Sequence, residues 1–158
     1  MISNFLRPLK ELLDLSFVNG PKRMLPYNRA FAYNFRNGFQ GSYPNLRIDF
    51  SLIRLSIGSL PNVGSPNCMS PIPGKLVFTW KINSDGRTRS EDLVYAAAYN
   101  PKTKLWIYGL NLVKRDLGIA TSEFAGLSNK SLHAYIGVLS PDGRTASNSM
   151  YLGEVSVR

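Results

Sequence analysis

The residues that most often carry acid–base, nucleophilic or metal chemistry are few in this sequence. It holds one histidine, His133, and one cysteine, Cys68. A hydrolase of the serine or cysteine type needs a nucleophile, a base and an orienting group, and no nucleophile-elbow motif accompanies His133. The residues around Cys68 include no basic neighbour that would lower the pKa of a thiol. We therefore expect a strand-borne histidine and an inert thiol.

Metal and nucleotide sites are not indicated either. One His with one Cys cannot supply the common zinc ligand sets, and no segment repeats carboxylates at the spacing of a calcium loop. The only adjacent acidic pair is Glu91-Asp92, whose side chains would point to opposite faces of a strand, so a solvated strand entry is expected. No phosphate-binding loop or dinucleotide fingerprint occurs. The sequence predicts no catalytic residue, no metal and no cofactor, and hence a protein that is not an enzyme.

Aromatic and basic side chains offer a binding surface instead. Eight Tyr, eight Phe and two Trp provide material for stacking against sugars, bases or partner side chains. In the segment 104–110, Leu105 and Ile107 alternate with Trp106 and Tyr108, so one of the two pairs should lie off the core. We expect a contact surface for a protein or a polyanion, formed by Tyr99, Lys102, Lys104, Trp106 and Tyr108.

The chain is strongly basic, with 19 Lys and Arg against 10 Asp and Glu, a net charge of +9 and a pI near 9.9. Such a charge favours an anionic partner, because neutralising phosphates releases counterions. The basic residues are spread evenly, however, and the densest pairs are only Lys22-Arg23, Arg87 with Arg89, and Lys114-Arg115. Nucleic-acid contact therefore stays open as an alternative, and the dispersed charge is its weakness.

The first part of the chain, residues 1–42, is predicted to be a helical hairpin. Apolar residues from Phe5 to Phe17 recur at spacings of three and four, and Asn19-Gly20-Pro21 supplies a stop signal. A second helix is expected from an N-cap at Asn28 to Asn37-Gly38. Arg29 and Arg36 would then lie on a solvated face.

From residue 43 onward the apolar period changes to two. The alternation shifts parity near residues 51–53, which predicts one long strand over 43–60 with a bulge. Residues 61–74 are rich in Pro and Gly and are predicted to be a linker.

Residues 75–158 are predicted to form a β-sandwich, one compact unit together with 43–60. Strands are expected at 76–82, 93–99, 104–110, 118–124, 132–139 and 145–157, separated by turn signals. The run from Leu93 to Tyr99 is apolar throughout, which is typical of a strand covered on both faces. We expect Trp80 and Tyr135 in the core.

The predicted fold class is mainly β: an antiparallel sandwich of immunoglobulin or fibronectin type III kind, preceded by a short helical hairpin. A length of 158 residues fits one domain, and the single cysteine excludes an intrachain disulfide, which favours the fibronectin variant. No apolar run approaches the roughly 18 residues of a membrane span. The N-terminus lacks the features of a secretory signal, so we expect a cytoplasmic protein.

Several short motifs together resemble an uncharacterised family of small proteins found mainly in Bacteroidota. They include Phe5-Leu6-Arg7-Pro8-Leu9, Gly41-Ser42-Tyr43-Pro44, Phe78-Thr79-Trp80 and Ser147-Asn148-Ser149-Met150-Tyr151-Leu152-Gly153. The resemblance spans nearly the whole chain and implies a helical segment followed by an immunoglobulin-like sandwich, with no established activity. Members usually begin with a further basic segment, to which nothing here corresponds, so Met1 is either an internal start or the start of a shortened relative.

Three functional hypotheses follow. The first is a non-enzymatic interaction or assembly module, because sandwiches commonly bind through edge strands or end loops. The second is a basic, nucleic-acid-associated or virion-like structural protein, whose binding would weaken steeply with salt. The third is an enzyme of unfamiliar type, which would need a pocket holding carboxylates of perturbed pKa. A protein partner or self-assembly is the expectation that the sequence favours.

Overall fold

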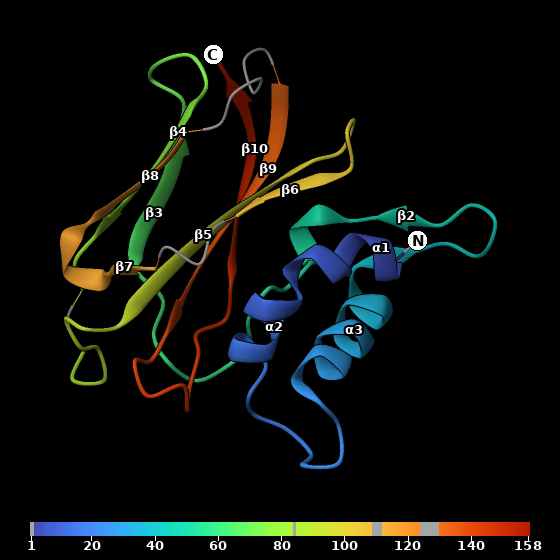
Figure 1. Cartoon of the computed structure of the whole chain (residues 1–158), viewed down its shortest axis with the longest axis horizontal. Helices are drawn as coiled ribbons and strands as arrows, with labels where there is room; N and C mark the ends of the chain where they lie inside the picture. Colours follow the sequence, from blue (N-terminus) through green and yellow to red (C-terminus); the bar gives the residue numbers. More distant parts are fainter. Residues whose placement is uncertain (1, 84, 109–111, 124–129) are drawn as a thin grey trace.

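The computed structural model of the chain describes residues 2–83, 85–108, 112–123 and 130–158. These residues form three layers: a three-stranded antiparallel sheet, a five-stranded antiparallel sheet, and a helical layer that covers the outer face of the second sheet (Figure 1). The expected strand positions that fall on residues 109, 110 and 124 lie outside the described residues.

The helical layer follows the predicted spacing of apolar residues. It comprises α1 (Ile2–Leu6), a 3₁₀ turn (Arg7–Leu9), α2 (Lys10–Ser16) and α3 (Pro26–Asn37). Pro8 falls within the 3₁₀ turn, since proline lacks the N–H that a continuous helix would need there. Helix α3 begins at Pro26, because the fixed φ of proline suits the first helical position, and the expected N-cap at Asn28 is wrong.

The sequence predicted that Arg29 lies on a solvated face, and this prediction is wrong. Its guanidinium donates hydrogen bonds to the carbonyl oxygens of Phe17, Pro21 and Met24, the Pro21 bond measuring 3.1 Å. These carbonyls belong to the end of α2 and to the loop before α3. Arg29 therefore fastens the connection between the two helices.

The long strand predicted over 43–60 is wrong. The segment from residue 39 contains only two short strands, β1 (Phe39–Gln40) and β2 (Arg47–Ile48), which pair with each other, and then a 3₁₀ turn (Phe50–Leu52). Asp49 caps this turn by accepting a hydrogen bond of 3.1 Å from the Ser51 N–H. The parity shift in the sequence marks a helical turn and not a strand bulge.

The residues after this turn run extended between the helices and the sheet, held by side chains. The Asn34 carboxamide accepts from the Arg54 N–H at 2.8 Å and donates to the Arg54 carbonyl at 2.8 Å. The Ser16 hydroxyl donates to the Leu55 carbonyl at 2.6 Å. Side chains of α2 and α3 thus satisfy backbone groups that a neighbouring strand would otherwise satisfy.

The two sheets have the strand arrangement of a fibronectin-type sandwich. In the first, the order is β3 (Gly64–Met69), β4 (Lys75–Lys81), β8 (Ile119–Glu123). In the second, the order is β10 (Met150–Val157), β9 (Lys130–Leu139), β5 (Leu93–Asn100), β6 (Leu105–Tyr108), and β7 (Val113–Lys114) also pairs with β5. All pairings are antiparallel. The predicted fold class is confirmed.

The predicted linker over 61–74 contains a strand, β3, and is wrong in that part. This strand pairs with β4 and lies at the edge of its sheet, and its register shifts between Gly64 and Asn67. An edge strand with a bulge tolerates Pro66, because the missing N–H removes no bond from the interior of the sheet.

The second sheet is buried on both faces. Along β5, Val94 and Ala98 pack into the core between the two sheets, whereas Tyr95 and Tyr99 pack under the helices. The prediction that this apolar strand is covered on both faces is therefore confirmed. Trp80 and Tyr135 are both buried, as predicted: Trp80 lies in the core between the sheets, and Tyr135 lies in the core beneath the helical layer.

Candidate functional site

The aromatic residues that the sequence assigned to an exposed contact surface lie largely within the helix-covered core. Tyr99 is 5% exposed, and Trp106 and Tyr108 are half-buried against the same cluster. The indole N–H of Trp106 donates to the Phe5 carbonyl at 2.7 Å. The expected exposure of these side chains is wrong, because helix α1 covers the outer face of the sheet.

A cleft of about 610 Å³ opens beside this cluster, and we call it the hairpin cleft. Its walls come from α1, from the segment around β2 and from the hairpin that joins β5 to β6. The lining residues are Asn4, Phe5, Leu46, Arg47, Ile48, Phe50, Tyr99, Pro101 and Lys104. Two residues of the predicted surface, Tyr99 and Lys104, therefore line the cleft, and Lys102, Trp106 and Tyr108 do not.

The hairpin wall is fixed by Asn100, which is 4% exposed. The side-chain oxygen of Asn100 accepts from the N–H groups of Lys102 at 3.0 Å and Thr103 at 3.3 Å. The Lys104 N–H donates to the Asn100 carbonyl at 2.8 Å, and Lys104 has a left-handed φ of 59°. A buried Asn that binds its own backbone in this way makes the turn a defined support for Lys104.

The opposite wall is equally anchored. The Asp49 N–H donates to the Gly38 carbonyl at 2.8 Å, and the Tyr135 hydroxyl donates to the Phe50 carbonyl at 2.6 Å. The ring of Phe50 lies 5.6 Å from that of Tyr99, and the ring of Phe5 lies 4.8 Å from Tyr99. Aromatic rings from three distant parts of the chain thus form a continuous floor.

The electrostatics of the cleft are those of an apolar floor with a cationic rim. Arg47 and Lys104 are exposed, and no ion pair among the described residues involves either of them. Among the residues that the structure describes, no Asp or Glu belongs to the lining. Burial raises the pKa of the Tyr99 hydroxyl, which therefore stays protonated at neutral pH.

His133 and Cys68 lie apart from each other. The His133 ring stacks on Phe50, with ring centroids 3.8 Å apart, and its Nδ1 shares a hydrogen bond of 2.7 Å with the Tyr151 hydroxyl. Burial lowers the pKa of His133. Cys68 belongs to the core between the sheets, where burial raises its pKa to about 12. Cys68 is thus a packing group of that core, and His133 is a half-buried ring held by Phe50 and Tyr151.

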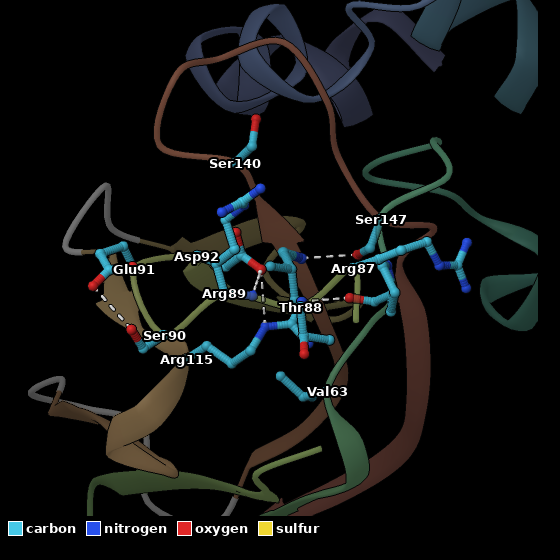
Figure 2. A network of polar contacts seen from close by, with 12 residues as sticks. Val63, Arg87, Thr88, Arg89, Ser90, Glu91, Asp92, Arg115, Ser140 and Ser147 are labelled. Carbon is cyan, nitrogen blue, oxygen red and sulfur yellow. Dashed lines mark hydrogen bonds and ion pairs between the residues drawn. The ribbon is translucent and has the colours of Figure 1, made fainter. Parts of the chain in front are cut away.

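The acidic pair Glu91-Asp92 divides between solvent and core. Figure 2 shows the Asp92 carboxylate between Arg115 and Arg89, with Glu91 directed toward Ser90. Asp92 is 1% exposed, and its Oδ2 lies 3.3 Å from Nε of Arg115 and accepts from the Arg89 N–H at 3.0 Å. A solvated strand entry is therefore wrong for Asp92 and holds for Glu91.

Arg115, the partner of Asp92, joins two further segments of the fold, 61–62 and 80–83. Its guanidinium donates to the carbonyls of Pro61 and Asn62, and to Asn83 Oδ1 at 3.1 Å. Its own carbonyl accepts from the indole N–H of Trp80 at 2.7 Å. Burial lowers the pKa of Arg115, and the charge of Asp92 opposes that effect. These contacts assign a structural role to the pair.

Two negative findings concern the described part of the chain alone. No three His, Cys, Asp or Glu residues there lie close enough together to hold a metal ion. None of the helices there has both the length and the apolar character that crossing a membrane requires.

Comparison with known proteins identifies a family. The model of a family of unknown function, DUF6266, matches residues 1–153. No curated protein matches the chain. The resemblance to an uncharacterised family is thus confirmed, and the expected bacterial source and missing N-terminal segment stay predictions.

Two similar solved structures are fn3 domains. One is from human collagen alpha-1(XX) chain, with 11% identity, a TM-score of 0.46, and coverage of 62% of this chain and 87% of that one. The other is from human contactin 1, with 10% identity, a TM-score of 0.43, and coverage of 75% and 93%. The fold assignment rests on the strand pairing described above.

Proposed function

We propose that this chain, which belongs to that family of unknown function, is a non-enzymatic interaction module that binds a segment of a partner protein in the hairpin cleft. The observation that carries the proposal is the cleft itself: an aromatic floor of Phe5, Phe50 and Tyr99 with a polar rim, built on anchored elements. A volume of about 610 Å³ lies within the usual range of ligand sites.

The rigidity of the floor supports this function. Side chains that are already held by their neighbours lose little conformational entropy when a partner binds. Phe5 is held by Tyr99 and by Trp106, whose ring centroid lies 5.2 Å away. The floor of the cleft is therefore preorganised for contact with apolar side chains of a partner.

The strand order favours a polypeptide as the occupant. Strand β6 is the last strand in the order β10-β9-β5-β6, and the hairpin that leads into it forms one wall of the cleft. The backbone at the edge of a sheet can pair with an extended segment of another chain while side-chain pockets beside it provide selectivity. Leu105 on this strand is 62% exposed.

Site-specific photocrosslinking tests the proposal. A photoreactive residue placed at Leu46, which lines the cleft, should form an adduct with a defined partner protein in cells that express the chain. The same residue placed at Met69, which is 44% exposed on β3, is the matched control. Adducts at Met69 with none at Leu46 would contradict the assignment of the cleft.

A filling variant adds a second test. Asn4→Trp should block the cleft, whereas Ser3→Trp, on the same helix and outside the lining, should leave partner binding unchanged.

Self-assembly is the form of this proposal in which the partner is a second copy of the chain. Light scattering after size exclusion, at low and moderate salt, separates that case, since a discrete multimer would persist in salt.

A further inference from the structure

The charges of the hairpin cleft come from two separate walls. Arg47 belongs to β2 and Lys104 to the turn between β5 and β6, and both line the same hollow. An anion bound in this cleft would be attracted by both cations. The cleft therefore has a charge preference in addition to its apolar floor.

The nearest carboxylate in the sequence does not cancel this preference. Asp49 accepts from the N–H of Ser51 at 3.1 Å and from its hydroxyl at 2.5 Å, and it also accepts from the Gln40 amide at 3.4 Å. It lines a neighbouring hollow on the His133 side and not the hairpin cleft. Arg47 borders both hollows, but among the described residues the lining of the hairpin cleft itself holds no carboxylate beside Arg47 and Lys104.

We propose that the hairpin cleft selects an apolar peptide segment that carries a carboxylate. The Arg47 guanidinium and the Lys104 ammonium hold the carboxylate, and the neighbouring apolar side chains of the peptide rest on Phe5, Phe50 and Tyr99. A guanidinium suits this role because its planar N–H groups match the two oxygens of a carboxylate. The inference rests on the proposed function and names the chemistry of the segment.

A matched pair of peptides tests the charge preference by calorimetry. The first is acetyl-Phe-Leu-Glu-Phe-amide, and the second replaces Glu with Gln, which keeps the size and removes the charge. We expect the Glu peptide to bind about 3- to 10-fold more tightly at low salt, the range that partly solvated ion pairs supply. Raising the ionic strength to about 0.5 M should reduce that ratio toward 1, because salt screens exposed charges.

Three variants locate the preference. Arg47→Gln and Lys104→Gln should each bring the ratio of the Glu-peptide affinity to the Gln-peptide affinity closer to 1. Lys102→Gln is the matched control, since Lys102 lies in the same turn but not in the lining. A loss of preference in Lys102→Gln equal to that in Lys104→Gln would overturn the inference, because it would show a general charge effect.

The outcomes separate the inference from the proposed function. Equal binding of the two peptides overturns the carboxylate preference and leaves the cleft as an apolar binding site. Binding of neither peptide, together with no Leu46 adduct in cells, overturns the cleft as the site of the proposed function. An oligothymidylate run in parallel covers the alternative of a nucleic acid, and tighter binding of it than of the Glu peptide would overturn the inference in favour of a phosphate backbone.

Discussion

Replacing Asp92 with Asn should be among the most damaging single changes in the sandwich. The change removes the charge that balances Arg115, which is 2% exposed, and it leaves a buried guanidinium without its carboxylate. Breaking a buried ion pair by removing one partner typically costs about 3–5 kcal/mol, because the remaining charge stays away from water. For a domain of this size that loss corresponds to a fall of about 6–20 °C in the melting temperature.

Urea and thermal unfolding of Asp92→Asn, Arg115→Met and the double variant measure this effect. Each single variant should be strongly destabilised, and the double variant should be less destabilised than the sum of the two, because no uncompensated charge remains. Glu91→Gln is the matched control, since Glu91 is the exposed neighbour and should leave the midpoint unchanged. A midpoint for Asp92→Asn equal to that of Glu91→Gln would refute the reasoning, as would strict additivity in the double variant.

Three further predictions concern single side chains. Trp106→Phe removes the donor to the Phe5 carbonyl and should cost about 1–2 kcal/mol in urea unfolding, whereas an unchanged midpoint would show that the bond contributes nothing. Burial lowers the pKa of His133 below its ordinary value of 6.5, so this side chain binds a proton more readily in the unfolded chain than in the native one. The free energy of unfolding should therefore fall as the pH drops from about 7 to about 5.5. His133→Gln should flatten that slope, and an unchanged slope would contradict the assignment. The pKa of Cys68 is raised to about 12, so alkylation should be slow in the native protein and fast in urea, and rapid native labelling would contradict its burial.

The sandwich was predictable because its strands carry their own pattern. Leu76, Phe78 and Trp80 occupy every second position of β4, and this strand has one buried and one partly exposed face as that pattern implies. The apolar run of β5 predicted burial on both faces, and the two cores confirm it. Patterns of this kind are local, so they predict a strand without any information on the elements that pack against it.

The segment from 43 to 60 was mispredicted because its partners are distant side chains. Asn34 and Ser16 satisfy the backbone at residues 54 and 55, and no local pattern in the sequence encodes that contact. The exposure of Tyr99 and Trp106 is mispredicted for the same reason, since the segment that covers them is α1, and Phe5 of that helix is 101 residues from Trp106. A period-2 pattern tells which residues share a face but not what covers that face.

The site was predictable only in part. Tyr99 and Lys104 were named from the sequence, because aromatic and basic residues cluster near the turn that follows β5. Arg47 and Phe5 were missed as site residues, since the sequence alone does not reveal that the first fifty residues fold back onto that turn. A signal is present in the alternation of Leu46, Ile48 and Phe50 around Arg47, but a period of two predicts a strand and not the wall of a cleft.

Nuclear magnetic resonance titration with acetyl-Phe-Leu-Glu-Phe-amide tests most directly whether the hairpin cleft is the binding site. Our account predicts that the largest amide shift changes occur at Asn4, Phe5, Arg47, Tyr99 and Lys104, with little change on β3 and β8 of the first sheet. Shift changes concentrated on the first sheet, or changes equally large in Asn4→Trp and in the unaltered chain, would contradict it.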